Sequence, residues 1–176
     1  MSIFNFSEEQ SLGEVRSVET SRITVRVTDG QRLQKARVGR LVAIQSVGDE
    51  WLIGIIERVW RHPVELPSFP EVDETIDLSA VPQEENGISI SLVGTYRSRD
   101  GLRKDVFTRA VFILPEINRS VFPIEEKSLE DFMGILSASS KADAVAPLKV
   151  GTYTLDGKAS AYIDGDKLFQ RHAALL

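Results

Sequence analysis

The chain has 176 residues, of which 42% are hydrophobic and 27% charged, a composition that is ordinary for a globular protein and excludes wholesale disorder. It has no cysteine, which excludes disulfides, thiolate metal sites and cysteine nucleophiles. The formal net charge of −5 comes from one stretch, because residues 63–86 carry seven acidic and no basic side chains and the rest of the chain is close to neutral at +2. That balance gives no overall basic footprint for nucleic acid and leaves a local one open.

Residues 1–62 predict the first strands of an antiparallel sheet that closes towards a barrel or sandwich. In "ITVRVT", residues 23–28, apolar and polar side chains alternate, as they do in a half-buried strand. Similar β-rich runs cover 12–18, 36–47 and 50–60, with turn residues between them. We therefore expect four strands by Trp60. Trp51 and Trp60 have opposite sheet parity, so one of them is expected in the core and the other at the surface.

The stretch 63–86 is acidic and rich in proline. Proline removes a ladder hydrogen-bond donor and favours extended neighbours, so this stretch is expected to run over the surface. A solvated insertion between strands is the favoured reading, and a partner-binding loop is the alternative.

Residues 87–127 predict a long hairpin that completes the sheet and turns at Asp100-Gly101. Four basic residues cluster at its tip: Arg97, Arg99, Arg103 and Lys104. They are candidates for contacting phosphates or an acidic partner, although charged tips also keep sheet edges soluble.

A helix is expected at 128–138, where the apolar period changes to about 3.6 and Ser128 fits an N-cap position. Residues 147–176 then predict the last barrel strands, with a turn at Asp156-Gly157, and end on the apolar run Ala173 to Leu176. We interpret that run as the start of a buried strand that leads into a further domain.

The sequence offers no self-contained active site. "GTYTLDGKAS" departs from a phosphate-binding loop, since five residues separate Gly151 from Gly157 and Ala159 stands where a hydroxyl is needed. The two histidines, His62 and His172, show no metal-ligand spacing. We therefore expect no catalytic residue, no metal and no cofactor in this segment. With no apolar run near 18 residues and no signal-peptide pattern, a cytoplasmic protein is expected.

The order of these stretches resembles the N-terminal barrel (HAS-barrel) of HerA-type ATPases of the FtsK/HerA superfamily, a module similar to the N-terminal barrel of ATP synthase subunits. The stretches that carry the likeness are "GEVRSVETSRITVRV", "ARVGRLVAI", "WLIGIIERV", "FTRAVFILPEINRSVFPI" and "LKVGTYTL…AYIDGDKLFQRHAALL". Ala110 departs from the glycine that the family has after Arg109. The resemblance covers roughly residues 8–176 and implies that the chain stops just before the Walker A loop.

By this resemblance the chain is a small antiparallel β-barrel with a short helical insertion, and the collar of a hexameric DNA-translocating ATPase. The collar would assemble with copies of itself and dock a partner nuclease or an anti-phage effector, while DNA passes through the parent ring, with no role for a membrane. ATP and Mg²⁺ would bind only in the ATPase domain. The family motifs make Phe107, Arg109, Arg171 and His172 candidates for structural or subunit-contact roles.

Two other functions stay open from the residues. A free-standing oligonucleotide-binding barrel needs aromatic platforms beside a basic groove, and only the 97–104 tip supports it. An enzyme in its own right ranks last. Salt dependence distinguishes the docking collar from the oligonucleotide-binding barrel, because phosphate binding weakens steeply with salt and apolar docking does not.

Overall fold

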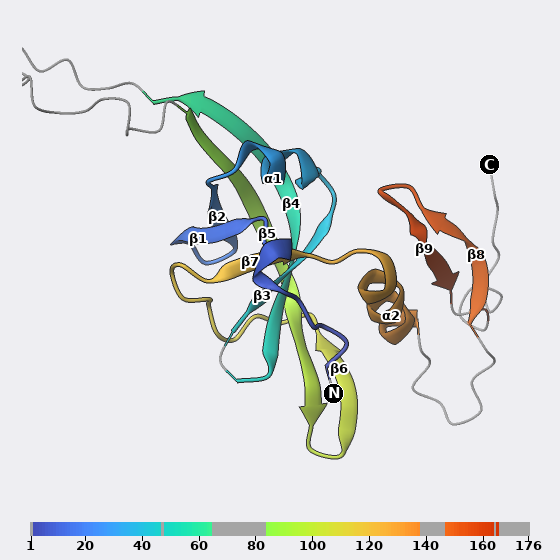
Figure 1. Cartoon of the computed structure of the whole chain (residues 1–176). Helices are drawn as coiled ribbons and strands as arrows, with labels where there is room; N and C mark the ends of the chain where they lie inside the picture. Colours follow the sequence, from blue (N-terminus) through green and yellow to red (C-terminus); the bar gives the residue numbers. More distant parts are fainter. Residues whose placement is uncertain (1, 47, 65–83, 138–146, 164, 166–176) are drawn as a thin grey trace, which may run out of the picture.

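The computed structural model describes residues 2–46, 48–64, 84–137, 147–163 and 165. Within them the chain forms mostly strands, with three short helical segments (Figure 1). In chain order the elements are η1 (Glu8–Gln10), β1 (Gly13–Val18), β2 (Arg22–Val27), α1 (Gly30–Lys35), β3 (Leu41–Gln45), β4 (Glu50–Pro63), β5 (Glu84–Asp100), β6 (Arg103–Thr108), β7 (Ser120–Pro123), α2 (Glu126–Ser137), β8 (Leu148–Tyr153) and β9 (Asp156–Ile163).

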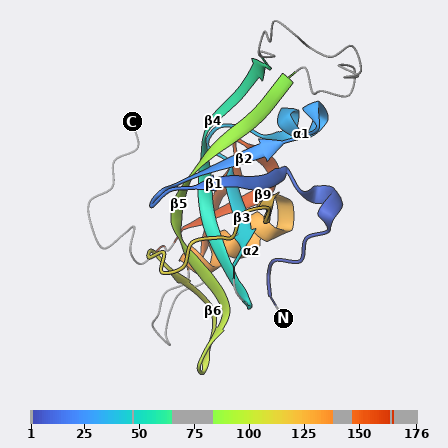
Figure 2. The same cartoon turned by 90° about the vertical axis from the view of Figure 1, so that its left-hand side faces the viewer.

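Six of the strands close into an antiparallel barrel, which confirms the predicted fold class. Around the ring the order is β2-β1-β7-β3-β4-β5, and β5 returns to pair with β2. This closing ladder runs from Arg22 opposite Ser91 to Val27 opposite Asn86. Figure 2 looks along a direction in which β1 and β2 cross in front of the long β4 and β5. β6 pairs only with the second half of β5 and lies outside the ring.

Alternating side chains of the six strands fill the barrel interior. Val25, Ile44, Leu52 and Ile90 are among the residues that are fully or almost fully buried there. Leu33 of α1 covers one end of the same core, and the Asp29 carboxylate caps that helix by accepting from the Gln31 N–H at 2.8 Å. Since one side of each strand faces this core, the period-two pattern of the sequence is explained.

A second core lies on the outer face of β3, β4 and β7. There the residues of opposite parity, such as Ala43, Ile53 and Phe122, pack against α2 and the N-terminal segment. Phe4 makes edge contacts with Trp51 and Tyr96 at ring-centroid distances of 5.7 and 4.9 Å. Both faces of these strands are therefore buried, which is why "WLIGII" is a continuous apolar run. Trp51 is the buried tryptophan of the pair, and Trp60 is partly exposed.

β8 and β9 differ from the prediction that the strands after residue 147 belong to the barrel. They pair with each other in a two-stranded sheet of their own (Figure 1). The physical reason is that β5 already closes the ring onto β2, so the ring has no edge left to accept another strand. The acidic stretch falls mainly in 65–83 and the apolar C-terminal run in 166–176, both outside the described residues.

The turn of this small sheet is at Thr154-Leu155 and not at the predicted Asp156-Gly157, and Asp156, the first residue of β9, is fastened to the start of α2. The Glu126 N–H donates to the Asp156 carboxylate, which also accepts from the Lys158 N–H at 3.1 Å. The Arg40 guanidinium connects the barrel to both elements. Its nitrogens lie 3.3 Å from the Glu125 carboxylate and 3.4 Å from the Leu155 carbonyl oxygen. α2 lies where the sequence predicts a helix but begins two residues earlier, so Ser128 is inside its first turn and Asp156 supplies the carboxylate at its start.

The bend in β4 and β5 depends on glycine. The register of the β4–β5 pairing shifts by one residue between Ile53 and Gly54, and such a bulge increases the local bend and twist of the strands. A Cβ on Gly54 would lie 2.4 Å from the Ile90 side chain and 2.9 Å from the Ser91 carbonyl oxygen. Only glycine allows the two backbones to approach this closely.

We expect Gly54→Ala to lower the free energy of unfolding by about 1–3 kcal/mol, because the added methyl group overpacks the barrel wall. Gly134→Ala in α2 is the matched control, since a Cβ there meets nothing within 4 Å. The control should raise the stability by about 0.5–1 kcal/mol through helix propensity. Urea unfolding followed by tryptophan fluorescence measures both, and equal effects would contradict the close approach.

We expect Asp156→Asn to lower the free energy of unfolding by about 0.3–1 kcal/mol at neutral pH, because it keeps the shape of the side chain and removes the negative charge at the start of α2. Burial by itself raises the pKa of Asp156, but backbone N–H donors from Glu126, Lys158 and Ala159 and the charge of Arg40 lower it overall. The carboxylate therefore stabilises the fold above the ordinary pKa of about 3.9 and loses that effect as pH falls through the lower folded-state value. Urea unfolding at neutral and acidic pH should show the difference between wild type and variant vanish in acid.

Candidate functional site

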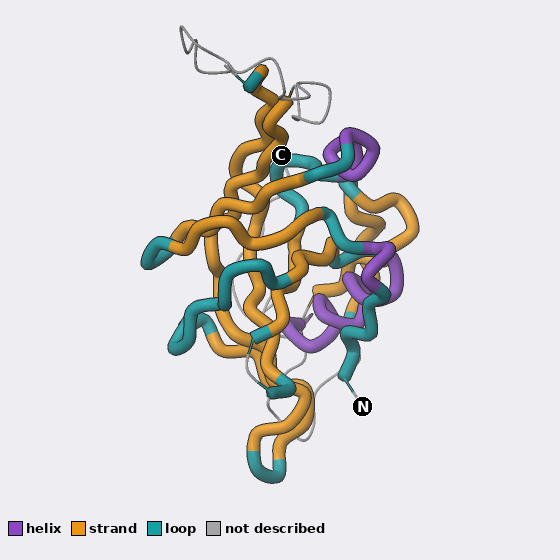
Figure 3. The backbone as a smooth tube through the Cα atoms, turned by 60° about the vertical axis from the view of Figure 1, so that its left-hand side comes forward, coloured by secondary structure: helices purple, strands orange, loops and turns teal. Residues whose placement is uncertain are grey.

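The predicted basic cluster lies on a two-stranded ribbon made by the second half of β5 and by β6. The ribbon projects from one end of the barrel in Figures 1, 2 and 3. Its turn is at Asp100-Gly101, with Gly101 at a φ of 61°. Arg97 stands apart from the other three cations, because its Nε lies 2.7 Å from the Glu50 carboxylate of β4. Among the described residues, no ion pair joins Arg99, Arg103 or Lys104 to an acidic side chain, and all three are exposed.

The root of the ribbon is rigid. The Tyr96 hydroxyl, fully buried, donates to the Asp105 carboxylate at 2.5 Å. Burial first, and then the hydrogen bond to Asp105, raise the pKa of Tyr96 to about 12. Asp105 itself has a φ of 54°, a left-handed conformation that a non-glycine residue adopts only where its surroundings enforce it. The carboxylate is thereby engaged at the root of the ribbon, although it lies two residues from Arg103 on the same strand.

Phe107 and Arg109 lie where β6 ends. The Phe107 ring packs edge-on against Phe132 of α2 at a centroid distance of 5.3 Å, so it connects the ribbon to the outer core. Arg109 is exposed at the start of the connection to β7. Arg171 and His172 lie outside the described residues.

The connection from β6 to β7 carries an exposed apolar surface. Four large side chains of this segment are exposed: Phe112 at 70%, Ile113 at 42%, Leu114 at 45% and Ile117 at 51%. We call these four the 112–117 surface. The sequence pattern does not indicate this surface, because the hairpin predicted over 87–127 includes the run "VFILP". The signal available in the sequence was the proline that ends the run, since proline does not continue a central strand.

Backbone contacts hold the segment that bears this surface at both ends. The Thr95 hydroxyl donates to the Ala110 carbonyl at 2.8 Å, and the Asn118 N–H donates to the Val15 carbonyl at 2.8 Å. Pro115 in the middle is buried, so the apolar side chains around it are displayed on a fixed loop. An exposed apolar patch of this kind marks an interaction surface.

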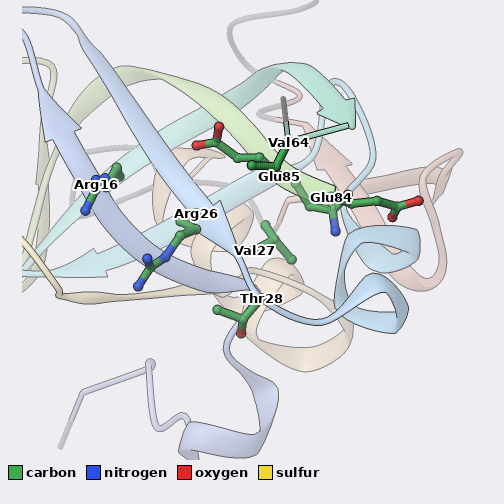
Figure 4. Close-up of a pocket in the computed structure, with 8 residues that line it drawn as sticks. Arg16, Arg26, Val27, Thr28, Val64, Glu84 and Glu85 are labelled. Carbon is green, nitrogen blue, oxygen red and sulfur yellow. The ribbon is translucent and has the colours of Figure 1, made fainter. Parts of the chain in front are cut away.

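A pocket of about 410 Å³ opens near the opposite end of the barrel from the ribbon. Figure 4 shows Arg16 and Arg26 on neighbouring strands, with Glu84 pointing away from them. Glu84 instead pairs with Arg61 at 3.4 Å. Val64 and Glu84 adjoin the segment 65–83, which lies outside the described residues, and we assign no role to this pocket.

The described residues contain no group of three or more His, Asp or Glu side chains arranged to hold a metal ion. Among the helices in the part of the chain that the structure describes, none is long and apolar enough to cross a membrane. The described residues thus present two candidate binding surfaces, the basic ribbon and the 112–117 surface.

No family model matches the chain, and a search of curated proteins finds no match.

The Tyr96–Asp105 hydrogen bond gives a pH prediction. An unfolded tyrosine has a pKa near 10, so with a folded value of about 12 the hydroxyl stabilises the fold fully below pH 10 and loses that effect as pH rises towards 12. We expect Tyr96→Phe to lower the free energy of unfolding by about 1 kcal/mol at pH 9 and the difference from wild type to shrink above pH 10. Urea unfolding at a series of pH values measures this. A difference that stays constant with pH would contradict it.

Proposed function

We propose that the chain is a non-catalytic assembly and docking barrel, the collar of a HerA-type DNA-translocating ATPase. In this role it associates with further copies of itself and recruits a partner nuclease or defence effector. The 112–117 surface is the observation that carries the proposal, and the closed six-stranded barrel has the architecture that the family resemblance implies.

The energetics favour contact with another protein at this surface. Fully burying one side chain of the size of Phe, Ile or Leu stabilises a complex by about 1.5–3 kcal/mol. Four such side chains stand on a loop whose backbone is already fixed, so little ordering entropy is lost when they are covered. The Arg119–Glu116 ion pair, with Nε 2.9 Å from the carboxylate oxygen, borders the surface with polar groups, as the rim of an interface does.

The occupant that we assign to this surface is a second copy of the chain. Self-association through it depends on apolar burial, and we expect it to survive moderate salt. Phosphate binding by an oligonucleotide-binding barrel would instead weaken steeply with salt.

We expect the double variant Phe112→Ser/Ile117→Ser to weaken self-association at least about ten-fold, which corresponds to about 1.4 kcal/mol. Sedimentation velocity and native mass spectrometry over a concentration series measure the oligomeric state. The matched control is Leu148→Ser/Val150→Ser on β8, which removes two side chains of similar exposure, 46% and 55%, far from the loop.

The control should leave the oligomeric state unchanged. A wild-type chain that stays monomeric at every concentration reached, or an equal loss of association in both double variants, would contradict assembly through the 112–117 surface.

A further inference from the structure

The tip of the β5–β6 ribbon presents cations on both of its faces. Arg99 and Lys104 stand directly opposite each other in the ladder and therefore share one face. Arg103 precedes Lys104 on β6, so its side chain leaves the opposite face. Two acidic residues lie near these three cations: Asp100, opposite Arg103, and Asp105, whose carboxylate accepts from the Tyr96 hydroxyl. The tip therefore keeps an excess of positive charge.

This arrangement costs stability in the free protein. Like charges placed directly opposite each other on a strand pair are destabilising. Within the described part of the chain, neither Arg99 nor Lys104 has an ion pair that would offset this cost. The neighbouring cation Arg97 shows the opposite situation, because Glu50 neutralises it at 2.7 Å. The charge of Arg97 is therefore already neutralised within the protein, whereas the charges of Arg99 and Lys104 are available to an external anion.

The residue at the end of the ribbon is apolar. Leu102 is 99% exposed, between Gly101 and Arg103, so it contributes nothing to either core. The tip therefore ends in a fully exposed leucine, and the cations lie behind it on the two faces of the ribbon.

We propose that the β5–β6 ribbon binds duplex DNA, with Arg99, Arg103 and Lys104 contacting phosphates and Leu102 reaching into the groove between them. A two-stranded ribbon fits the major groove of B-DNA, and a groove has a phosphate strand on each side to meet cations from both faces. The site lies apart from the 112–117 surface, so the inference goes beyond the proposed function and the two can fail separately.

Two other ligands match the tip less well. A flat acidic protein surface would meet one face of the ribbon and leave the other cations unpaired. A membrane would gain the burial of one leucine, about 1.5–3 kcal/mol, which is too little for stable anchoring.

The test is fluorescence anisotropy of a short labelled DNA duplex over a salt series. With three phosphate contacts, the slope of log K against log salt should be about −2.7, and it should fall to about −0.9 in Arg99→Ala/Lys104→Ala. That variant should bind roughly ten-fold more weakly at low salt. Its folding stability should be unchanged or slightly higher, because the like-charge pair is gone.

Arg16→Ala/Arg26→Ala is the matched control, since it removes the same charge from the other end of the barrel and should leave the binding and its slope near the wild-type values. Leu102→Ala should weaken binding roughly five-fold without changing the slope, because it removes apolar contact only.

The proposal is overturned if the wild type does not bind the duplex. It is also overturned if Arg99→Ala/Lys104→Ala and the control Arg16→Ala/Arg26→Ala lose binding equally. Binding to phosphatidylserine vesicles as tight as to DNA, lost in the same ribbon variant, would overturn it in favour of a membrane. Displacement of the duplex by poly-glutamate as effectively as by unlabelled DNA would overturn it in favour of an acidic polypeptide.

Discussion

The pairing of β2 with the first half of β5 is the contact on which the rest of the structure depends. It joins the two ends of the strand order, so that a sheet which would otherwise have two open edges becomes a barrel. Because the β2 ladder uses β5 only as far as Ser91, the same edge of the strand is free further along to pair with β6, while β4 stays paired to the other edge as far as Arg97. Barrel closure and the projecting ribbon are therefore two consequences of one long strand.

Closure also decides where the second core forms. With the interior filled by one set of alternating residues, the opposite set on β3, β4 and β7 faces outwards and is too apolar to remain in water. α2 and the N-terminal aromatic residues cover it, and the Arg40 and Asp156 contacts fasten α2 and the small β8–β9 sheet to the barrel. These polar contacts sit at the edge of the apolar layer, where they fix the position of elements that hydrophobic packing alone would leave free to slide.

The two candidate surfaces differ in chemical character. The 112–117 surface is apolar and its loop is held at one end by the Thr95 hydroxyl and at the other by a backbone hydrogen bond, which suits a protein neighbour. The ribbon tip is cationic, stands away from the barrel and retains an uncompensated like-charge pair, which suits a polyanion. The collar function that we propose, with protein bound at one place and nucleic acid at another, would use this separation, because a single mixed surface would make the two partners compete.

The sequence by itself determined the strands up to Trp60, the hairpin turn at Asp100-Gly101 and the amphipathic helix, because each depends on local periodicity and on residues with special backbone preferences. It also placed the basic cluster at the hairpin tip. Only the tertiary structure decided which cations of that cluster stay unneutralised, since Glu50 reaches Arg97 across a strand pair that brings together residues 47 positions apart. It likewise decided that β8 and β9 lie outside the barrel, and that Phe112 and Ile117 face solvent. Strand partners and exposure depend on contacts between distant segments, and alternation along one strand says which residues share a face but not what that face meets.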